Sequence, residues 1–564
     1  MTDAGTTTFA TAFAEALEEL GVRHAFGVSG GAISFFWSAL GGPGIQVTHF
    51  RHESGAAFAA CEASVATGAP VVVFVTTGPG LTNVLTGVYA ARHEPARVIL
   101  VSACTDAGMY GRRPIQETGP RTLPHEGLFT AGPLFDIATM VTTAEELPAL
   151  AGVLAEAVST GQRFVAHISL TLRAQRGLTH RVHPAIRAAA RPDVSKSAAD
   201  AFELLHNRRW VLWVGAGTRR LAGPVRRLAE ATGVAVMATP RGKGVIAEEH
   251  PRYLGVTGFG GHPSVLDHLR RERPEYTLVL GTALGDAASG YLPGYLPGIA
   301  FIHVDTDPSV PGAAYPDAMT VPVIADAGEF ADQLAAHFEK RPATRSTAAA
   351  PDVHPFACSA PGRDGGRVHP AYLMEVVQEV FVEAGVLVMA ETGNAMAWAI
   401  NRLRFGDPRQ WRTPSGMVGS MAHCSTGVVG AALVTSRKTV ALVGDGTMLM
   451  LNEVSTAVAT GAPAIWVVLN DSCYNMCAQG AEVLGLTDVD CRLPDTDFAG
   501  YARTLGACGI SVARPDEVLG GLRTALARPG PVVVDVKVDP AIGAPTAGRN
   551  AGLLRDRVDH TAAP

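Results

Sequence analysis

The chain has 564 residues and a net charge of −6, with 47% apolar and 17% charged residues. This length predicts three to four domains, and the composition is typical of a large globular protein with much buried surface. No basic block stands out and the longest apolar runs have the length of strands, so neither nucleic-acid binding nor a membrane span is expected.

The eight cysteines are scattered and form no CxxC pair. We therefore expect reduced thiols in a cytoplasmic protein rather than a disulfide framework. The start of the sequence lacks a basic stretch followed by an apolar run, so no secretory signal is expected. Cys473 and Cys477 have no His or Cys partner at ligand spacing, which disfavours a metal site built on thiols.

Short β-rich runs alternate with helical stretches in three segments of the chain. This alternation predicts an α/β protein with three consecutive doubly wound parallel-sheet domains. We expect them at residues 1–178, 194–340 and 367–545, with a linker at 341–366 and a tail at 546–564. Residues 178–193 and 341–366 are rich in Ala and Pro and lack apolar periodicity, as extended connections do.

In the first domain, a strand that starts near residue 47 is expected to run into a small-residue helix at 55–66, with Glu53 at the junction. A strand at 71–75 then leads into the glycine-rich turn 77–83. Taken alone, Glu53 reads as an acid that stabilises the dipole of its own helix.

The central domain opens with a strand at 210–214 and the turn Gly215-Ala216-Gly217, which is half of a dinucleotide fingerprint. Arg220 stands where the fingerprint needs its final glycine. A tight structural turn is therefore favoured over a nucleotide site.

In the third domain, an apolar run ends in Gly444-Asp445-Gly446, and a helix at 448–460 and a strand at 464–469 are expected before Asn470-Asp471. Asp445 thus lies beside a helix N-terminus, where backbone N–H groups favour a phosphate. Because a carboxylate repels phosphate unless a divalent cation lies between them, Asp445 and Asp471 predict a metal-bridged diphosphate. The alternative is a surface turn beside an acidic loop.

The spacing of these residues resembles the thiamine-diphosphate (ThDP) motif, in which GDG precedes Asn-Asn or a variant by about two dozen residues. Two more runs match in the family's order, Arg51-His52-Glu53 followed by Gly78-Pro79-Gly80, and Gly419-Ser420-Met421. From about residue 8 to 538, the chain resembles the acetolactate synthase and pyruvate decarboxylase superfamily of ThDP enzymes.

The resemblance implies that Glu53 shares a proton with N1′ of the cofactor's aminopyrimidine. It places Met421 under the bend between the two cofactor rings and the carbonyl of Gly419 beside the N4′ amino group. The metal, Mg²⁺, would be bound by Asp445, Asp471 and the backbone carbonyl of Cys473, with Asn470 as an alternative ligand. Asp471 departs from the family's asparagine and adds a negative charge. Further cofactor-binding residues implied are Gly80, Asn83, Thr392, Gly393, Asn394, Gly444, Gly446 and Thr447.

The resemblance also implies an assembly. In this family, one cofactor lies between the first domain of one subunit and the third domain of another, so a homodimer or homotetramer with interfacial active sites is expected. Some relatives bind FAD in the central domain, but residues 281–286 lack the arginine-rich pattern of acetolactate synthases. FAD is therefore not favoured.

A small 2-oxo acid, pyruvate by default, is the implied donor. Residues 26–33 and 115–118 are similar to acetolactate synthases, in which a glutamine matched by Gln116 faces the thiazolium. The twin histidines of pyruvate decarboxylases are absent. We therefore expect a carboligase or acyl transferase that adds the acyl unit to a second carbonyl.

Other reactions stay open. The run from Gly419 to Ser425 is similar to phosphonopyruvate and sulfopyruvate decarboxylases, so a non-ligating decarboxylase is the alternative, and a flavin-linked oxidase comes third. His423 in this run is either a group that titrates near neutral pH or a hydrogen-bonded core histidine. A non-catalytic regulatory subunit is disfavoured because both Glu53 and Asp445 are present.

Overall fold

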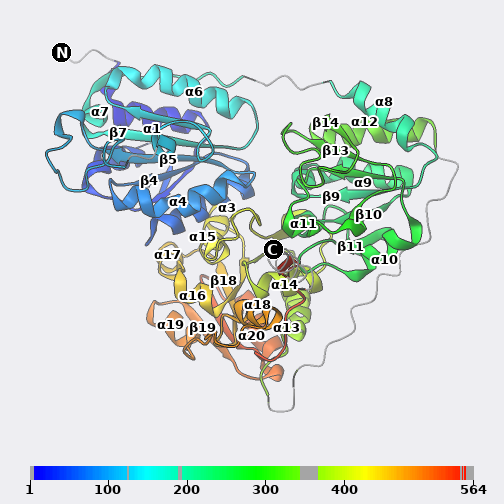
Figure 1. Ribbon diagram of the computed structural model, residues 1–564. Helices are drawn as coiled ribbons and strands as arrows, with labels where there is room; N and C mark the ends of the chain where they lie inside the picture. The colour runs from blue at the N-terminus through cyan, green and yellow to red at the C-terminus, as the bar shows by residue number, and fades with distance from the viewer. Residues whose placement is uncertain are drawn as a thin grey trace, which may run out of the picture.

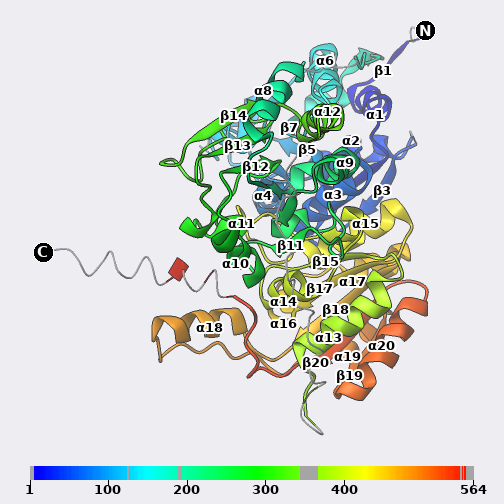
Figure 2. The same cartoon turned by 90° about the vertical axis from the view of Figure 1, so that its right-hand side faces the viewer.

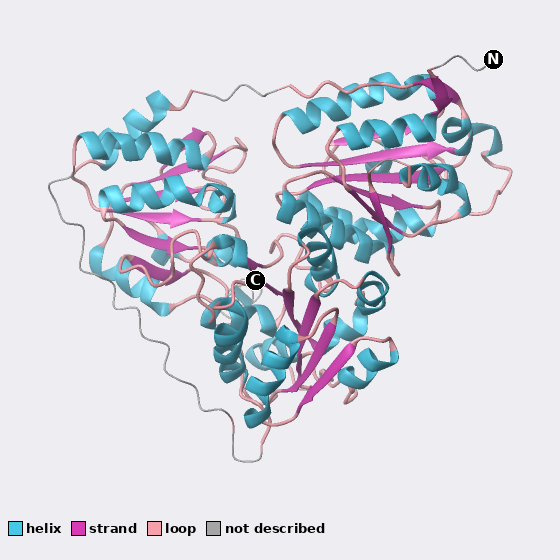
Figure 3. Cartoon of the chain, turned by 180° about the vertical axis from the view of Figure 1, so that it is seen from behind, coloured by secondary structure: helices cyan, strands magenta, loops and turns pink. Residues whose placement is uncertain are grey.

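The chain folds into three α/β domains, each built on a parallel sheet that has six strands in the described residues and is flanked by helices (Figures 1 and 3). The fold predicted from the sequence is therefore confirmed. The computed structural model describes residues 5–42, 44–123, 126–187, 193–342, 362, 366–546, 549 and 552–553. Most of the expected linker at 341–366, and nearly all of the tail at 546–564, lies outside the described residues.

The first domain has the strand order β3-β2-β4-β5-β7-β6. Its strands are β2 (His24–Gly27), β3 (Gln46–His49), β4 (Val71–Val75), β5 (Arg97–Cys104), β6 (Ile137–Val141) and β7 (Phe164–Thr171). Its helices are α1 (Phe9–Glu19), α2 (Ser34–Leu40), α3 (Glu53–Thr67), α4 (Pro79–Arg92), α5 (Glu126–Phe129), α6 (Leu147–Ser159) and α7 (Leu172–Arg176).

The start of the expected first linker is not an open connection. Residues 178–180 form β8 (Leu178–His180), which pairs antiparallel with β1 (Thr6–Thr8). Both ends of the first domain are therefore joined by backbone hydrogen bonds.

The central domain has the strand order β11-β10-β9-β12-β13-β14. Its strands are β9 (Trp210–Val214), β10 (Ala235–Ala238), β11 (Tyr253–Val256), β12 (Tyr276–Leu280), β13 (Ala300–Asp305) and β14 (Thr320–Ile324). Its helices are α8 (Ser195–Leu205), α9 (Ala222–Thr232), α10 (Pro263–Glu272), α11 (Asp286–Ser289) and α12 (Ala327–Lys340).

The third domain has the strand order β16-β15-β17-β18-β20-β19. Its strands are β15 (Leu387–Ala390), β16 (Trp411–Arg412), β17 (Thr439–Gly444), β18 (Ala464–Asn470), β19 (Cys508–Val512) and β20 (Val532–Lys537). Its helices are α13 (Pro370–Val377), α14 (Asn394–Arg402), α15 (His423–Thr435), α16 (Asp445–Met450), α17 (Val454–Thr460), α18 (Asn475–Leu484), α19 (Phe498–Thr504) and α20 (Pro515–Ala527). Figure 2 shows α18 projecting from the body of this domain.

The single helix expected at 448–460 is divided into α16 and α17. The chain leaves the helical conformation at Leu451, whose φ is −163°, and re-enters it after Glu453. Glu453 is fully buried and accepts hydrogen bonds from the backbone N–H groups of Arg51 and His52 in the first domain. The contact of Glu453 with the first domain explains why the helix is interrupted. Helix periodicity in the sequence does not reveal this interruption.

Helix α3 lies between the first and third domains and packs closely on both sides. It is rich in alanine, and residues 53–64 are buried. A β-carbon at Gly87 of α4 would lie 2.5 Å from the Ala57 side chain, and one at Gly427 of α15 would lie 2.7 Å from Glu62 Cγ. Small residues therefore allow the backbones of three helices to approach one another. Among the described helices, none combines the length and the apolar character that crossing a membrane requires.

Gly430→Ala should destabilise the protein, because a β-carbon at Gly430 would overlap the carbonyl oxygen of Ala59 on α3. Overpacking of this kind costs about 1–3 kcal/mol, and denaturant unfolding should show it. Gly152→Ala in α6 is the control, since nothing lies within 4 Å of the position of its β-carbon. Equal stability of Gly430→Ala and the wild type would contradict the close packing of α3 and α15.

Candidate active site

The carboxyl edge of the third sheet collects the residues expected to bind the diphosphate and its metal. Strands β15, β17 and β18 are parallel neighbours. They are followed by Thr392 to Asn394, by Asp445 and by Asp471, respectively. In open parallel sheets, this edge is where ligands bind.

Asp445, which is buried, and Asp471, which is half-buried, form an acidic pair. Asp445 accepts a hydrogen bond of 2.7 Å from its neighbour Gly446 N–H and one of 3.3 Å from Cys473 N–H. Asn475 Nδ2 donates to Asp471 Oδ2 at 2.7 Å. Burial, and then the charge of Asp471, raise the pKa of Asp445 to about 6, and burial also raises the pKa of Asp471. Two such oxygen donors fit a hard divalent cation, which would relieve their repulsion.

The polar groups around this pair fit an anionic ligand. Helices α14 and α18 begin here at N-caps without side-chain hydrogen bonds, so their first N–H groups remain as donors, whereas in α16 the N–H of Gly446 donates to Asp445. Asn394 Oδ1 and Ser472 Oγ are buried and have no partner among the described residues. A β-carbon at Gly446 would lie 2.5 Å from the Tyr474 ring, which explains this glycine. Gly444 ends β17, and Thr447 is buried in α16.

Asn470, the alternative metal ligand, is hydrogen-bonded through its Nδ2, while its buried Oδ1 has no partner among the described residues. It is fully buried, and its Nδ2 donates to Asp535 Oδ1 at 2.8 Å and to the Thr496 carbonyl at 2.9 Å. The role of Asn470 as a metal ligand therefore stays a prediction.

The turn that precedes α15 has an unusual backbone. Gly419 has a φ of +58°, and Ala422, the N-cap of α15, has a φ of +74°. An alanine in the left-handed region is strained and is kept there by its surroundings. Met421, between these residues, is half-buried.

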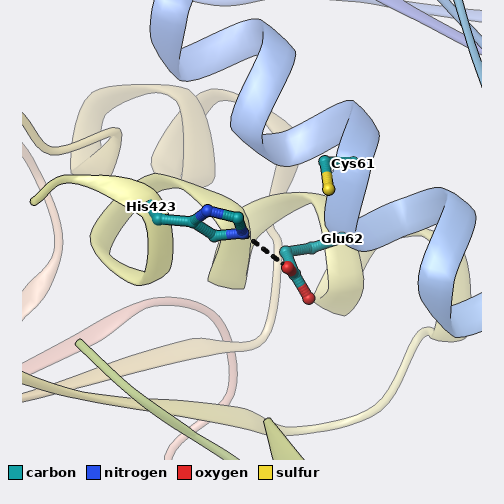
Figure 4. A group of neighbouring side chains, drawn as sticks. All are labelled: Cys61, Glu62 and His423. Atoms are coloured by element: carbon teal, nitrogen blue, oxygen red, sulfur yellow. Dashed lines mark hydrogen bonds and ion pairs between the residues drawn. The ribbon is translucent and has the colours of Figure 1, made fainter. Parts of the chain in front are cut away.

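His423 starts α15 and lies in the core. It is 1% exposed, its Nε2 lies 2.6 Å from Glu62 Oε1 of α3 (Figure 4), and its ring packs on Phe58 with centroids 5.0 Å apart. Of the two alternatives for His423, the structure therefore supports a hydrogen-bonded core histidine.

Glu62 belongs to an ion network that joins all three domains and that the sequence did not reveal. Arg412 of β16 contacts both Glu62 oxygens at 2.7 Å and Glu94 at 2.8 Å, and Arg241 of the central domain also pairs with Glu94. Burial acts to raise the pKa of Glu62, but Arg412 and His423 hold it well below its usual range. Because Arg412 occupies both Glu62 oxygens, the nearby group of Cys61, Glu62 and His423 (Figure 4) is poorly suited to a metal ion.

The carboxyl edge of the first sheet collects the residues expected near the pyrimidine. Asn83 Nδ2 donates to Glu53 Oε2 at 3.1 Å, which orients this largely buried carboxylate at the start of α3. Thr77 donates to Gln116 Oε1 at 3.0 Å, and Gln116 is exposed with a φ of +56°. Gly80 is buried in the first turn of α4. The structure thus brings Glu53, Asn83, Gly80 and Gln116 to one edge.

Glu453 supports the turn that carries Glu53, although the sequence alone gave no sign of this role. Besides the N–H groups of Arg51 and His52, it accepts a hydrogen bond from the Thr456 hydroxyl. A β-carbon at Gly55 would lie 2.5 Å from its carboxylate. Burial raises the pKa of Glu453 to about 7. The only sequence signal for this role would have been an acidic residue, Glu453, within the helix expected at 448–460.

The half fingerprint of the central domain is a packed turn. Gly217 N–H donates to the Gly281 carbonyl at 2.9 Å, and a β-carbon at Gly217 would lie 2.9 Å from Gly281 Cα. The close approach of two turns explains this glycine without a nucleotide.

Comparison with known protein families agrees with this arrangement. Residues 7–122 match the N-terminal TPP binding domain of thiamine pyrophosphate enzymes, residues 198–334 match their central domain, and residues 391–536 match their C-terminal TPP binding domain. The chain belongs to the thiamine pyrophosphate enzymes. Thiamine pyrophosphate is ThDP, so this protein is a ThDP-dependent enzyme that acts on carbon–carbon bonds, and the family predicted from three short motifs is confirmed.

Individual relatives of this ThDP enzyme span nearly its whole length. It is 29% identical to an acetolactate synthase of Mycobacterium leprae, over 92% of this chain and 85% of the relative. It is 25% identical to the acetolactate synthase isozyme 1 large subunit of Escherichia coli, over 93% and 92%. Its fold is similar to that of benzoylformate decarboxylase from Polynucleobacter necessarius, with a TM-score of 0.82 and 19% identity, over 95% and 99%.

Stabilisation of this ThDP enzyme by Mg²⁺ should depend on pH through Asp445. A cation binds the carboxylate form, and with a pKa of about 6 roughly a tenth of Asp445 is deprotonated at pH 5. The increase in melting temperature caused by Mg²⁺ with ThDP should therefore be small at pH 5 and grow toward pH 7.

Asp445→Ala should lose this increase at every pH and lose ThDP binding, as calorimetric titration would show. The matched control is Asp497→Ala, which removes an acid of the same domain that caps α19. Unchanged ThDP affinity in Asp445→Ala would place the metal site elsewhere.

Proposed function

We propose that this enzyme is a carboligase that decarboxylates a small 2-oxo acid, pyruvate by default, and adds the acyl unit to a second carbonyl compound. The observation that carries the proposal is the position of Gln116. The Thr77 hydroxyl holds its side chain at the sheet edge where Glu53 and Asn83 meet. Relatives named acetolactate synthases at 25–29% identity support it.

The residues of the chain have separate roles in this proposal. ThDP, when bound, supplies the electron sink that allows a 2-oxo acid to lose CO₂. Glu53, oriented by Asn83, would exchange a proton with N1′ of the pyrimidine. Met421 would support the rings from below, and the Gly419 carbonyl would accept a hydrogen bond from N4′.

The diphosphate end would be bound by Mg²⁺ on Asp445, Asp471 and the carbonyl of Cys473. The uncapped start of α14 and the side chains of Thr392, Asn394 and Thr447 would add hydrogen bonds. His423 would act through Glu62 rather than touch the substrate, since it is buried.

The arrangement of α3 and α15 supports an active site shared by two copies of the chain. Gly430 faces Ala59 and Gly427 faces Glu62, so the two helices run antiparallel. Glu53 is nine residues, or about 13 Å of helix, from Glu62, which lies near the start of α15. Glu53 and Met421 are therefore at opposite ends of the helix pair, and a second chain has to bring such ends together.

Exposed apolar side chains beside the candidate site are consistent with this assembly. Their exposed fractions lie between 40% and 93%, and a second chain that covers this region would bury them. They are Tyr89, Ile115, Met417, Leu449, Met450 and Tyr474.

Product analysis tests the proposed reaction. The purified protein with ThDP and Mg²⁺ is incubated with pyruvate, alone and with a panel of aldehydes and 2-oxo acids, and the products are identified by mass spectrometry. An acceptor that gains an acetyl-derived unit would support the carboligase. Acetaldehyde and CO₂ alone would instead favour a decarboxylase, as the run from Gly419 to Ser425 suggests.

Glu53→Gln should retain the fold and ThDP but lose about 10² to 10⁴ in kcat, because the general acid–base contact is lost. Steady-state kinetics at saturating ThDP would measure the loss. Glu329→Gln is the control, since Glu329 also lies in the first turn of a helix, α12. If Glu53→Gln were as active as this control, Glu53 would merely stabilise its helix.

A further inference from the structure

Glu391 lies between the two turns expected to bind opposite ends of the cofactor. It directly follows β15 and is fully buried. Its backbone N–H donates to the Leu442 carbonyl at 2.9 Å, which extends the pairing of β15 with β17. The backbone of Glu391 is thereby fixed to the strand that leads into Gly444 and Asp445.

The carboxylate of Glu391 is bound by both turns. Its Oε1 accepts a hydrogen bond from Thr392 N–H at 3.1 Å. Its Oε2 accepts from Cys424 N–H at 2.8 Å and from Ser425 N–H at 3.1 Å, in the first turn of α15. One side chain thus connects the turn of Thr392 to the helix that follows Met421.

Helix α15 requires this outside acceptor because its own N-cap is an alanine. Ala422 has no side-chain oxygen to accept from the first N–H groups, and it has the strained φ of +74°. In most helices, a Ser, Thr, Asp or Asn at the N-cap accepts from the second or third residue. Glu391 makes the same hydrogen bonds to the second and third residues of α15, from a different element.

The direction of its hydrogen bonds sets Glu391 apart from the residues that face the ligand. A carboxylate that faced a diphosphate would repel it. The carboxylate of Glu391 accepts hydrogen bonds from backbone N–H groups and is therefore not available to the ligand. Burial raises the pKa of Glu391 to about 7, while His423 and the three N–H donors act to lower it. The N-caps of α14 and α18 make no side-chain hydrogen bond, whereas the first N–H groups of α15 donate to Glu391.

We infer that Glu391 is a positioning residue, which fixes the turn of Gly419 and Met421 relative to the diphosphate-binding turn at Thr392 to Asn394. This inference rests on the proposed function, which assigns one turn to the rings of ThDP and the other turn to its diphosphate. Without the carboxylate, Ala422 would leave its strained conformation, and the support expected from Met421 would shift.

The test compares Glu391→Ala, Glu391→Asp and Glu391→Gln with the wild type. Amide hydrogen exchange of residues 419–425 is measured in the apoprotein, and ThDP affinity is measured by titration in the presence of Mg²⁺. Glu391→Ala should expose the amides of Cys424 and Ser425 and weaken ThDP binding by about tenfold to a hundredfold, as expected for lost hydrogen bonds to a charged group. Aspartate is shorter by one methylene and should behave similarly.

Glu391→Gln keeps one acceptor oxygen, so it should restore part of the protection and of the affinity. If Glu391→Ala does not fold, the comparison of Glu391→Gln with the wild type tests the inference. Glu248→Gln is the control for loss of a buried carboxylate, since Glu248 pairs with Lys243 in the central domain. This control should lower the melting temperature but leave ThDP affinity unchanged.

Two results would overturn the inference: exchange at residues 419–425 that does not differ between wild type and Glu391→Ala, or loss of ThDP affinity in Glu248→Gln equal to that in Glu391→Gln. A wild-type protein that binds no ThDP would overturn the proposed function instead. The exchange measurement needs no cofactor, so it decides on the role of Glu391 in either case.

Discussion

The burial of α3 between two domains is the constraint on which the rest of the structure depends. Its small residues allow α4 and α15 to approach its backbone, and its one charged side chain in mid-helix, Glu62, is paired with Arg412. Breaking such a buried pair costs about 3–5 kcal/mol because the remaining charge keeps its desolvation penalty. Glu94 and Arg241 extend the pairing into the central domain. The three sheets are thereby held so that two carboxyl edges, each with part of the site, have fixed positions.

Five buried acids of this protein form two groups by their partners. Glu62 and Glu94 face guanidinium groups, and their pKa values are held low despite burial. Asp445, Glu391 and Glu453 face mainly backbone N–H groups, and burial raises their pKa values to between about 6 and about 7. The first group is structural. The second surrounds the candidate site, where raised pKa values are characteristic of functional positions.

Much of the fold and of the candidate site could be predicted from the sequence because both follow local rules. Strands of parallel sheets are apolar runs, and the turns after them hold Asp445 and Asp471, which their spacing indicates, and Glu53, which the resemblance to a family motif indicates. The rest depends on contacts across long sequence separations. The pairing of Glu62 with Arg412 joins residues 350 positions apart, and that of Glu453 with Arg51 joins residues 402 positions apart. No periodicity encodes such contacts, so the sequence wrongly predicts one helix where α16 and α17 are separate, and it does not decide between the two alternatives for His423.

The pairing of β1 with β8 has a consequence for the modular character of this chain. Thr6 lies opposite His180, so the first domain enters and leaves through neighbouring strands. A domain whose two ends are adjacent tolerates insertion into another chain, or circular permutation at a surface loop, with its sheet intact. The position of the first domain in the chain is therefore not constrained by its own sheet, whereas its contact with the third domain through α3 is fixed by packing.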